Sequence, residues 1–345
     1  MKRILLNGII VAVVGIVLVV LVFFTEGLDG LVSLFVKIDY LWMGAAFLIL
    51  ILYWALGTVT LGIIKKGMLQ KADPGHNMKI NMVGVFFNGI TPFATGGQPA
   101  QVYLMNRMGI DSGIGSSIVI VKSFLHSSLL FLYALVFWIA RHEYLTGQIP
   151  GIYPMLVFAA TINLLLISFY LMVLLNEGAG KNLVHWLFNL IVWLRIKKDT
   201  AAAREKINVA LYNFTDGVRI LKKKPGFFLV AILTQAAQLF AFFAIPVILH
   251  RAIEGDFSQY MNLFICTAML ILISSMIPTP GSTIGAEGLA LLFIAKFFIG
   301  SPALAVVLIW RVVTYYAGVL AGGIVCMFIP DRCIAPEYQK GKAYE

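Results

Sequence analysis

Phe86-Phe-Asn-Gly-Ile-Thr-Pro-Phe-Ala-Thr-Gly-Gly-Gln-Pro-Ala100 is the stretch that decides how this chain folds. It lies inside hydrophobic sequence, yet Thr91-Pro92 and Gly96-Gly97-Gln98-Pro99 cannot continue a helix, because proline lacks a donor and paired glycines cost conformational entropy. A second such break follows at Ile277-Pro-Thr-Pro-Gly-Ser-Thr-Ile-Gly-Ala-Glu-Gly288. In lipid, a broken helix is tolerated only where protein or a water-filled cavity satisfies the freed backbone groups. Two interrupted hydrophobic segments in corresponding places of two halves therefore indicate the binding site of a transporter.

The composition places the chain in a membrane. Its 345 residues are 60% hydrophobic and 12% charged, the mean hydropathy is +0.92, and several apolar runs exceed the ~18 residues typical of a spanning helix. We therefore predict an all-α polytopic membrane protein with one integral membrane domain over residues 1–345. The net charge of +10 lies mostly in loops, where it sets topology, and does not indicate nucleic-acid binding. Neither the three cysteines nor the five histidines show metal-ligand spacing, so no metal or cofactor is expected.

Long apolar runs alternate with polar segments along the chain. Six full spans are expected at residues 4–24, 41–64, 114–140, 152–175, 227–249 and 303–329, two broken segments at about 80–110 and 259–299, and a basic cytoplasmic connector at about 176–226. Each half of the first break holds about 12 residues, or ~18 Å, which is too short to cross a ~30 Å hydrocarbon core. A re-entrant hairpin is therefore predicted. Residues 183–194, which carry Trp186 and Trp193, are also too short to span and are predicted to lie in the membrane interface.

The positive-inside rule places both termini in the cytoplasm, and span–hairpin–span then occurs twice in opposite orientations. This predicts an inverted repeat of residues 41–140 and 227–329 in the cell membrane. In the alternative, residues 260–277 cross the membrane completely, and the parity of the number of membrane crossings changes. A register between the halves supports the repeat. An offset of 188 residues matches Thr91-Pro92 with Thr279-Pro280, and an offset of 189 matches Gly96 with Gly285, Gln98 with Glu287, Arg107 with Lys296 and Lys122 with Arg311.

Two of these basic residues fall deep inside predicted spans. Lys122 lies ~12 Å along its span, and Arg311 lies equally deep from the other side. An intramembrane charge is costly and by default marks a functional site, and the alternative is a structural ion pair with Glu287. In the inverted topology, Arg107, Lys122, Arg311 and Lys296 form a ladder from the inner to the outer face. An anion crossing the membrane would meet a basic partner at each level.

The helices that restart after the two breaks are predicted to begin inside the membrane. Pro99 suits a first helical position after Gly97, and Ser282 and Thr283 are good caps for a helix that begins near Gly285. Exposed N–H groups and the helix dipole make such ends anion sites.

Three further side chains carry open alternatives. Glu287 either caps its own helix or binds a proton or a headgroup amine, whereas Gln98 can hydrogen-bond a polyol or a phosphate. His126, one turn from Lys122, either belongs to a polar pathway or is a satisfied core histidine.

The two motifs resemble a known family. Asn88-x-x-Thr-Pro92 with Gly96-Gly97-x-Pro99, and Pro278-x-Pro-Gly281 with Gly285-x-Glu287-Gly288, Arg311 and Tyr315, are similar to the membrane region of lysylphosphatidylglycerol synthases, the flippase part of the multiple peptide resistance factor. The resemblance covers nearly the whole chain and implies a lipid-translocating domain. In two-part members a separate soluble domain transfers lysine from lysyl-tRNA to phosphatidylglycerol. Only residues 330–345 follow the last predicted span here, so we do not expect that transfer in this chain.

We therefore expect a phospholipid flippase or scramblase for an anionic or aminoacylated lipid of the phosphatidylglycerol or lysyl-phosphatidylglycerol type. The residues expected to bind it are Asn88, Thr91, Gly96, Gly97, Gln98, Arg107, Lys122, His126, Thr279, Ser282, Thr283, Gly285, Glu287, Lys296, Arg311 and Tyr315. One alternative is a membrane-embedded transferase with Glu287 and His126 as its acid–base pair. Another is the membrane subunit of a separately encoded phosphatidylglycerol lysyltransferase in cationic peptide resistance, docked at the basic connector.

Overall fold

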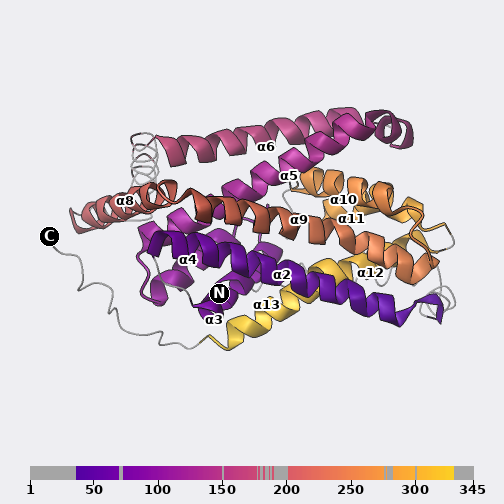
Figure 1. The fold of residues 1–345 in the computed structure, drawn as a ribbon, viewed down its shortest axis with the longest axis horizontal. Helices are drawn as coiled ribbons and strands as arrows, with labels where there is room; N and C mark the ends of the chain where they lie inside the picture. The colour runs from indigo at the N-terminus through magenta and orange to yellow at the C-terminus, as the bar shows by residue number, and fades with distance from the viewer. Residues whose placement is uncertain are drawn as a thin grey trace.

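The computed structural model describes residues 36–69, 73–149, 151–176, 178, 182, 186, 189, 201–275, 277, 283–299 and 301–329. Every regular element in this part of the chain is helical (Figure 1), which confirms the predicted all-α class. Five helical runs are long and apolar enough to cross a membrane: α2 (Tyr40–Leu69), α5 (Ser112–Gln148), α6 (Ile152–Leu175), α9 (Pro225–Glu254) and the run Ala303–Met327. They coincide with the last five predicted spans. The first predicted span, residues 4–24, lies outside the described residues.

The first predicted break separates two short helices, α3 (Pro74–Gly89) and α4 (Gly97–Arg107). Asp73 caps the start of α3, where its side chain accepts from the backbone N–H of His76 at 3.0 Å. Between the helices, Phe93 and Ala94 have φ values of 54° and 52°, a left-handed conformation that is rare for residues with a Cβ. The chain thus turns back at the Thr-Pro and Gly-Gly positions, and α3 and α4 pack against each other as a hairpin.

The helices that follow begin and end where local sequence signals indicate. Asp111 caps α5 by accepting from Gly113 N–H at 2.7 Å. The backbone of Arg141 leaves helical geometry (φ −143°, ψ 25°), one residue after the predicted end of that span at 140. The next helix, α6, has the predicted bounds of 152 and 175.

The second break separates α10 (Tyr260–Ser274) from α11 (Thr283–Phe293), which η1 (Ala295–Phe297) follows. The 15 residues of α10 extend about 22 Å, less than a ~30 Å hydrocarbon core. The last run consists of α12 (Ala303–Arg311), the π-helical turn η2 (Val312–Tyr316) and α13 (Ala317–Met327). A π turn inside an α-helix often marks a functional site.

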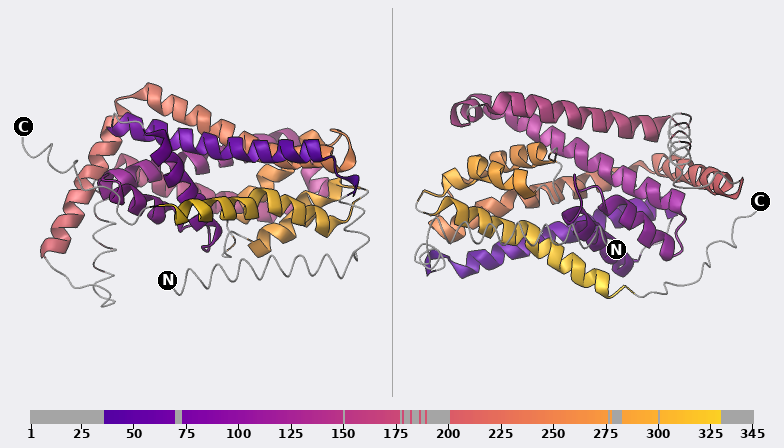
Figure 2. Two further views of the ribbon diagram at one scale, coloured as in Figure 1. Left: turned by 90° about the horizontal axis from the view of Figure 1, so that it is seen from below. Right: turned by 180° about the vertical axis from the view of Figure 1, so that it is seen from behind.

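The helices that the predicted repeat would match make similar pairs of contacts. The first long helices of the halves, α2 and α9, run side by side along the long axis (Figure 2). The first hairpin packs through α3 against α13, and the second hairpin packs through α10 against α5. Gly322 of α13 allows its close approach, because a Cβ there would lie 2.7 Å from the carbonyl oxygen of Met82 in α3. The outer helix α6 contacts α5 and α10 at the edge of the bundle (Figure 1).

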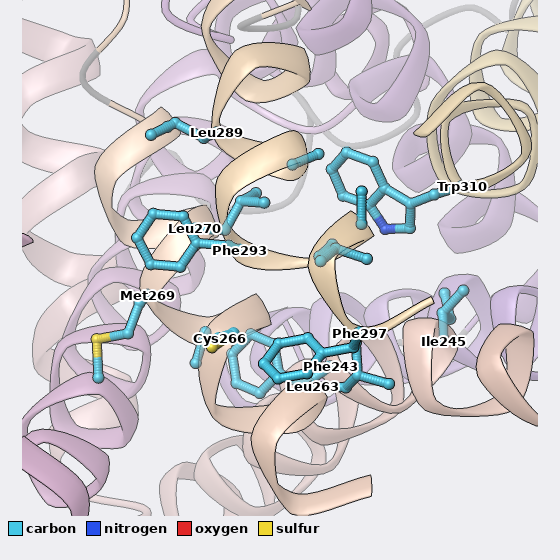
Figure 3. Packing of buried hydrophobic residues seen from close by; sticks show 14 of the residues in the cluster. Phe243, Ile245, Leu263, Cys266, Met269, Leu270, Leu289, Phe293, Phe297 and Trp310 are labelled. Atoms are coloured by element: carbon cyan, nitrogen blue, oxygen red, sulfur yellow. The ribbon is translucent and has the colours of Figure 1, made fainter. Parts of the chain in front are cut away.

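A buried apolar cluster fixes the second hairpin. Phe243 of α9, Cys266 of α10, Phe293 of α11 and Trp310 of α12 are at most 1% exposed and belong to this cluster (Figure 3). Large core side chains stabilise by roughly 1.5–3 kcal/mol each when fully buried. The hairpin is therefore held by the core on several sides.

One helix was not predicted within the basic connector. In α8 (Ala201–Lys222) the residues Leu211, Phe214, Val218 and Leu221 are buried, and α8 packs on α5 and α2 while it runs across the long axis (Figure 2). Their 3-4-3 spacing is the signal of an amphipathic helix. Most of residues 183–194, the predicted interfacial segment, lie outside the described residues.

Candidate functional site

A polar cavity of about 430 Å³ lies between the two hairpins and the long helices. This volume is in the range of small-molecule sites. Polar side chains in its wall come from both parts of the chain and from α6: Tyr53, Asn81, Asn88, Gln98, Gln101, Lys122, Ser123, His126, Ser127, Tyr170, Gln235, Gln238, Ser274, Ser275, Arg311, Thr314 and Tyr315. Polar residues inside membrane spans are costly and mark ion or substrate pathways. The cavity is therefore the candidate site.

Lys122 reaches into the cavity from the first third of α5 and has neutral partners. Its Nζ donates to the Gly57 carbonyl at 3.0 Å and to Asn81 Oδ1 at 2.7 Å. The amide nitrogen of Asn81 donates in turn to the Trp54 carbonyl at 3.1 Å. Dipoles of α2 and α3, rather than a carboxylate, thus hold this ammonium group.

Arg311 enters the cavity wall from the end of α12 and has a charged neighbour. Its Nε lies 3.5 Å from Oε1 of Glu287 in α11, and the two residues are 4% and 8% exposed. The guanidinium carbon also lies 5.0 Å from the ring centroid of Trp310 and 5.1 Å from that of Tyr315, a cation–π geometry. Tyr315 in η2 donates its hydroxyl to the Gly89 carbonyl at 2.8 Å. The π turn thereby joins Arg311 to the end of α3.

A short polar chain lies near Lys122 on the α5 and α9 side. Nδ1 of His126 is 3.4 Å from Nε2 of Gln235, which donates to Oε1 of Gln238 at 2.9 Å. Gln235 is fully buried, and its own Oε1 has no hydrogen-bond partner among the described residues. Leaving a buried acceptor unpaired costs roughly 1–3 kcal/mol. A ligand that donates a hydrogen bond here would remove that cost.

The backbone N–H groups at the start of α4, predicted as an anion site, donate to side chains of the same hairpin. Gly96 N–H donates to Oγ1 of Thr91 at 2.8 Å, and Gly97 N–H donates to Oδ1 of Asn88 at 2.9 Å. A Cβ on Gly97 would overlap the Asn88 side chain. These four residues therefore build the turn of the first hairpin, and Asn88 also lines the cavity.

The cavity brings together six of the predicted binding residues from both halves, namely Asn88, Gln98, Lys122, His126, Arg311 and Tyr315. Glu287 joins them through Arg311. His126 and Glu287 contact different partners, so the described residues show no contact between the acid and the base expected of a transferase.

The other predicted residues lie elsewhere. The guanidinium group of Arg107 lies over the Tyr103 ring, and the ammonium group of Lys296 lies over the Phe297 ring. Neither cation lines the cavity. Only the two inner members of the predicted ladder are thus in the wall. Gly285 packs closely on the Ile277 side chain. Thr279 and Ser282 lie outside the described residues, and for Thr283 only its place at the start of α11 is described.

Several lining residues were not predicted, among them Asn81, Gln235, Gln238, Ser123 and Ser274. Their signal in the sequence was an amide or hydroxyl inside an otherwise apolar run, as in Gln235-Ala-Ala-Gln238.

A second, wholly apolar cavity of about 140 Å³ lies between α5, α6 and α10. It is lined by Phe131, Ala134, Leu135, Trp138, Tyr153, Leu156, Val157, Ala160, Met269 and Leu272. The same three helices contribute to the polar cavity.

Comparison with known proteins places the chain among membrane proteins. A family described as the lysylphosphatidylglycerol synthase TM region matches residues 8–322. A protein of Archaeoglobus fulgidus described as a UPF0104 membrane protein is 25% identical over 301 residues, which are 85% of this chain and 88% of that protein. No solved structure matches the chain significantly. The matched region includes both hairpins and every residue that lines the polar cavity.

Proposed function

The chain belongs to the family of lysylphosphatidylglycerol synthase TM regions, and on that premise we propose that it moves a phospholipid headgroup across the cytoplasmic membrane. Its substrate is an anionic or aminoacylated phospholipid of the phosphatidylglycerol type. The observation that carries the proposal is the polar cavity with Lys122 and Arg311 in its wall. A headgroup that enters it keeps hydrogen-bond partners at a depth where lipid offers none.

The two cations supply the attraction for the lipid phosphate. At an effective dielectric constant of about 20, a phosphate ~4 Å from one cation gains roughly 4 kcal/mol. This gain offsets part of the headgroup's desolvation. Lys122 can exchange its neutral partners for a phosphate oxygen without leaving another charge unpaired.

The apolar cavity supplies a place for an acyl chain. It is lined by residues of α5, α6 and α10, three helices that also contribute to the polar cavity. A lipid with its headgroup in one cavity and a chain in the other would keep both parts in a matching environment. The outer position of α6 favours lateral entry beside that helix.

We further propose that the halves form an inverted repeat whose hairpins re-enter the membrane. The corresponding contacts α3–α13 and α10–α5 support this, as does the meeting of Lys122 and Arg311 at one cavity. The hairpin helices have 16, 11, 15 and 11 residues, and each is shorter than the ~20 residues needed to span. Opposed repeats around a midplane site are the architecture of alternating-access transporters.

Lipid translocation in proteoliposomes tests the proposal. Fluorescent phosphatidylglycerol and its lysyl form are scored for access to an impermeant quencher, with the wild type beside Lys122→Gln, Arg311→Gln and the exposed control Lys66→Gln. We expect fast exchange in the wild type and the control and a loss in the two cavity variants. Wild-type exchange no faster than in empty liposomes would contradict transport. Exchange unchanged in both cavity variants would contradict the cavity as the path.

A further inference from the structure

The wall of the polar cavity contains two cations and, among the described residues, no carboxylate. Glu287 lies behind the wall, 3.5 Å from Arg311. The other acidic residues that the structure describes lie near helix ends, in loops or on α8: Asp39, Asp73, Asp111, Glu143, Glu205, Asp216, Glu254 and Asp256. An ammonium group in the cavity would therefore meet like charge without a free counter-charge, which disfavours it strongly away from water.

Six carboxamides share the cavity wall with the two cations: Asn81, Asn88, Gln98, Gln101, Gln235 and Gln238. A carboxamide carries both donors and an acceptor, and some of these groups already bond the protein, as in Asn81 and Asn88. Serine and threonine hydroxyls from α5, α10 and η2 add further polar groups. The fully buried Gln235 leaves its Oε1 without a partner among the described residues. Beside two cations, the donor that suits this acceptor is an uncharged hydroxyl group.

We propose that the cavity selects the headgroup of an anionic, hydroxylated and amine-free phosphate lipid and discriminates against aminoacylated headgroups. The phosphate contacts Lys122 and Arg311, and headgroup hydroxyls bond the amides around Gln235. This inference rests on the proposed function and specifies its substrate class. Glycerol phosphates and sugar phosphates share this chemistry, so a glycerophospholipid and a polyprenyl-linked sugar phosphate are the two sources that the test separates.

The test compares binding and transport of four lipids by the whole protein. Native mass spectrometry measures binding, and quencher access in proteoliposomes measures transport, for phosphatidylglycerol, lysyl-phosphatidylglycerol, phosphatidic acid and a polyprenyl phosphohexose. We expect phosphatidylglycerol or the phosphohexose to exceed the lysyl lipid at least tenfold in both, which corresponds to about 1.4 kcal/mol, and the stronger of the two identifies the source. Equal or stronger binding of the lysyl lipid would overturn the selectivity. Selective binding without transport of any lipid would overturn the proposed function while supporting the headgroup class.

A carboxylate placed in the wall should weaken or remove the preference. Gln98→Glu introduces an acid at the position that the proposed repeat matches with Glu287. We expect it to lower the ratio of phosphatidylglycerol to lysyl-phosphatidylglycerol, in binding and in transport, about tenfold. The control Asn106→Asp adds the same charge to α4 at an exposed position outside the cavity wall and should leave the ratio unchanged. An unchanged ratio in a folded Gln98→Glu protein, or the same drop in the control, would overturn the argument from charge.

A separate variant tests the recognition of hydroxyl groups. Gln235→Met keeps the length of the side chain but removes its amide. The preference for phosphatidylglycerol over phosphatidic acid should fall severalfold, while phosphatidic acid itself binds as before. An unchanged preference would contradict the role of the amides, and Gln238→Met repeats the test should the first variant not fold.

Discussion

Removing Lys122 should change the stability of the protein little, whereas removing Arg311 should lower it strongly, because the partners of the two cations differ. In Lys122→Met the protein loses two hydrogen bonds from an ammonium group, at 3.0 and 2.7 Å. Bonds to charged groups contribute ~1.5–3 kcal/mol each, so about 3–6 kcal/mol is lost. The variant also avoids the desolvation of an ion that no carboxylate compensates, which costs several kcal/mol. The two terms nearly cancel, and we expect a stability within ~1 kcal/mol of the wild type.

Arg311→Met is expected to be much less stable. It leaves Glu287, which is 8% exposed, without the guanidinium 3.5 Å away. Removing one partner of a buried ion pair costs ~3–5 kcal/mol. The double variant Arg311→Met/Glu287→Gln removes the orphaned charge and should recover most of that loss.

Thermal unfolding in one detergent, followed by circular dichroism, measures the three variants, and lipid exchange is assayed on the same preparations. We expect Lys122→Met to be near wild-type stability and inactive, Arg311→Met to be destabilised, and the double variant to be restored in stability. A loss above ~3 kcal/mol in Lys122→Met with near wild-type stability in Arg311→Met would refute the reasoning. It would mean that Lys122 is the structural charge.

Asp73→Ala should cost ~1 kcal/mol at neutral pH. The backbone hydrogen bond from His76 lowers the pKa of Asp73 in the folded protein. The stabilisation by Asp73 is therefore present above about pH 4 and is lost as the pH falls through the lowered pKa. Unfolding midpoints of the variant and the wild type, measured against pH, test this difference. Gly322→Ala places a methyl group 2.7 Å from a backbone oxygen of α3 and should destabilise by ~1–3 kcal/mol in thermal unfolding; an unchanged midpoint would show that α13 can shift freely. Ala160→Phe fills the apolar cavity and should slow lipid exchange with little change in the unfolding midpoint, whereas normal exchange would exclude an acyl chain there.

The ends of the helices could be predicted because local chemistry sets them. Proline and glycine ended α3 and opened α4, and polarity at Arg141 ended the apolar run of α5. The positions of Lys122 and Arg311 inside long apolar helices also followed from spacing alone. A charge in such a run faces the bundle interior or a water-filled cavity, because it is too costly in lipid.

The inward faces of the helices could not be predicted in the same way. The spans are apolar nearly all round, so their sequence does not say which side meets a neighbour, and Gln235 became a cavity residue only through the packing of α9 on α2 and α5. The hydrogen bonds of Asn88 and Thr91 to the start of α4 likewise depend on the folded arrangement of the hairpin. Both side chains, predicted to bind the ligand, satisfy backbone groups of the turn, and Asn88 also lines the cavity.

The two cavity cations have different partners, and this difference affects how a phosphate is held. The proposed repeat matches Gln98 with Glu287. The carboxylate of Glu287 takes part of the charge of Arg311, whereas Lys122 keeps amide and carbonyl partners. A phosphate that binds Lys122 displaces neutral groups that can find other partners. A phosphate that binds Arg311 must compete with Glu287 for it. The larger share of the attraction therefore falls to Lys122, and for this reason the stable Lys122→Met variant should lose more transport than the double variant that removes both members of the ion pair.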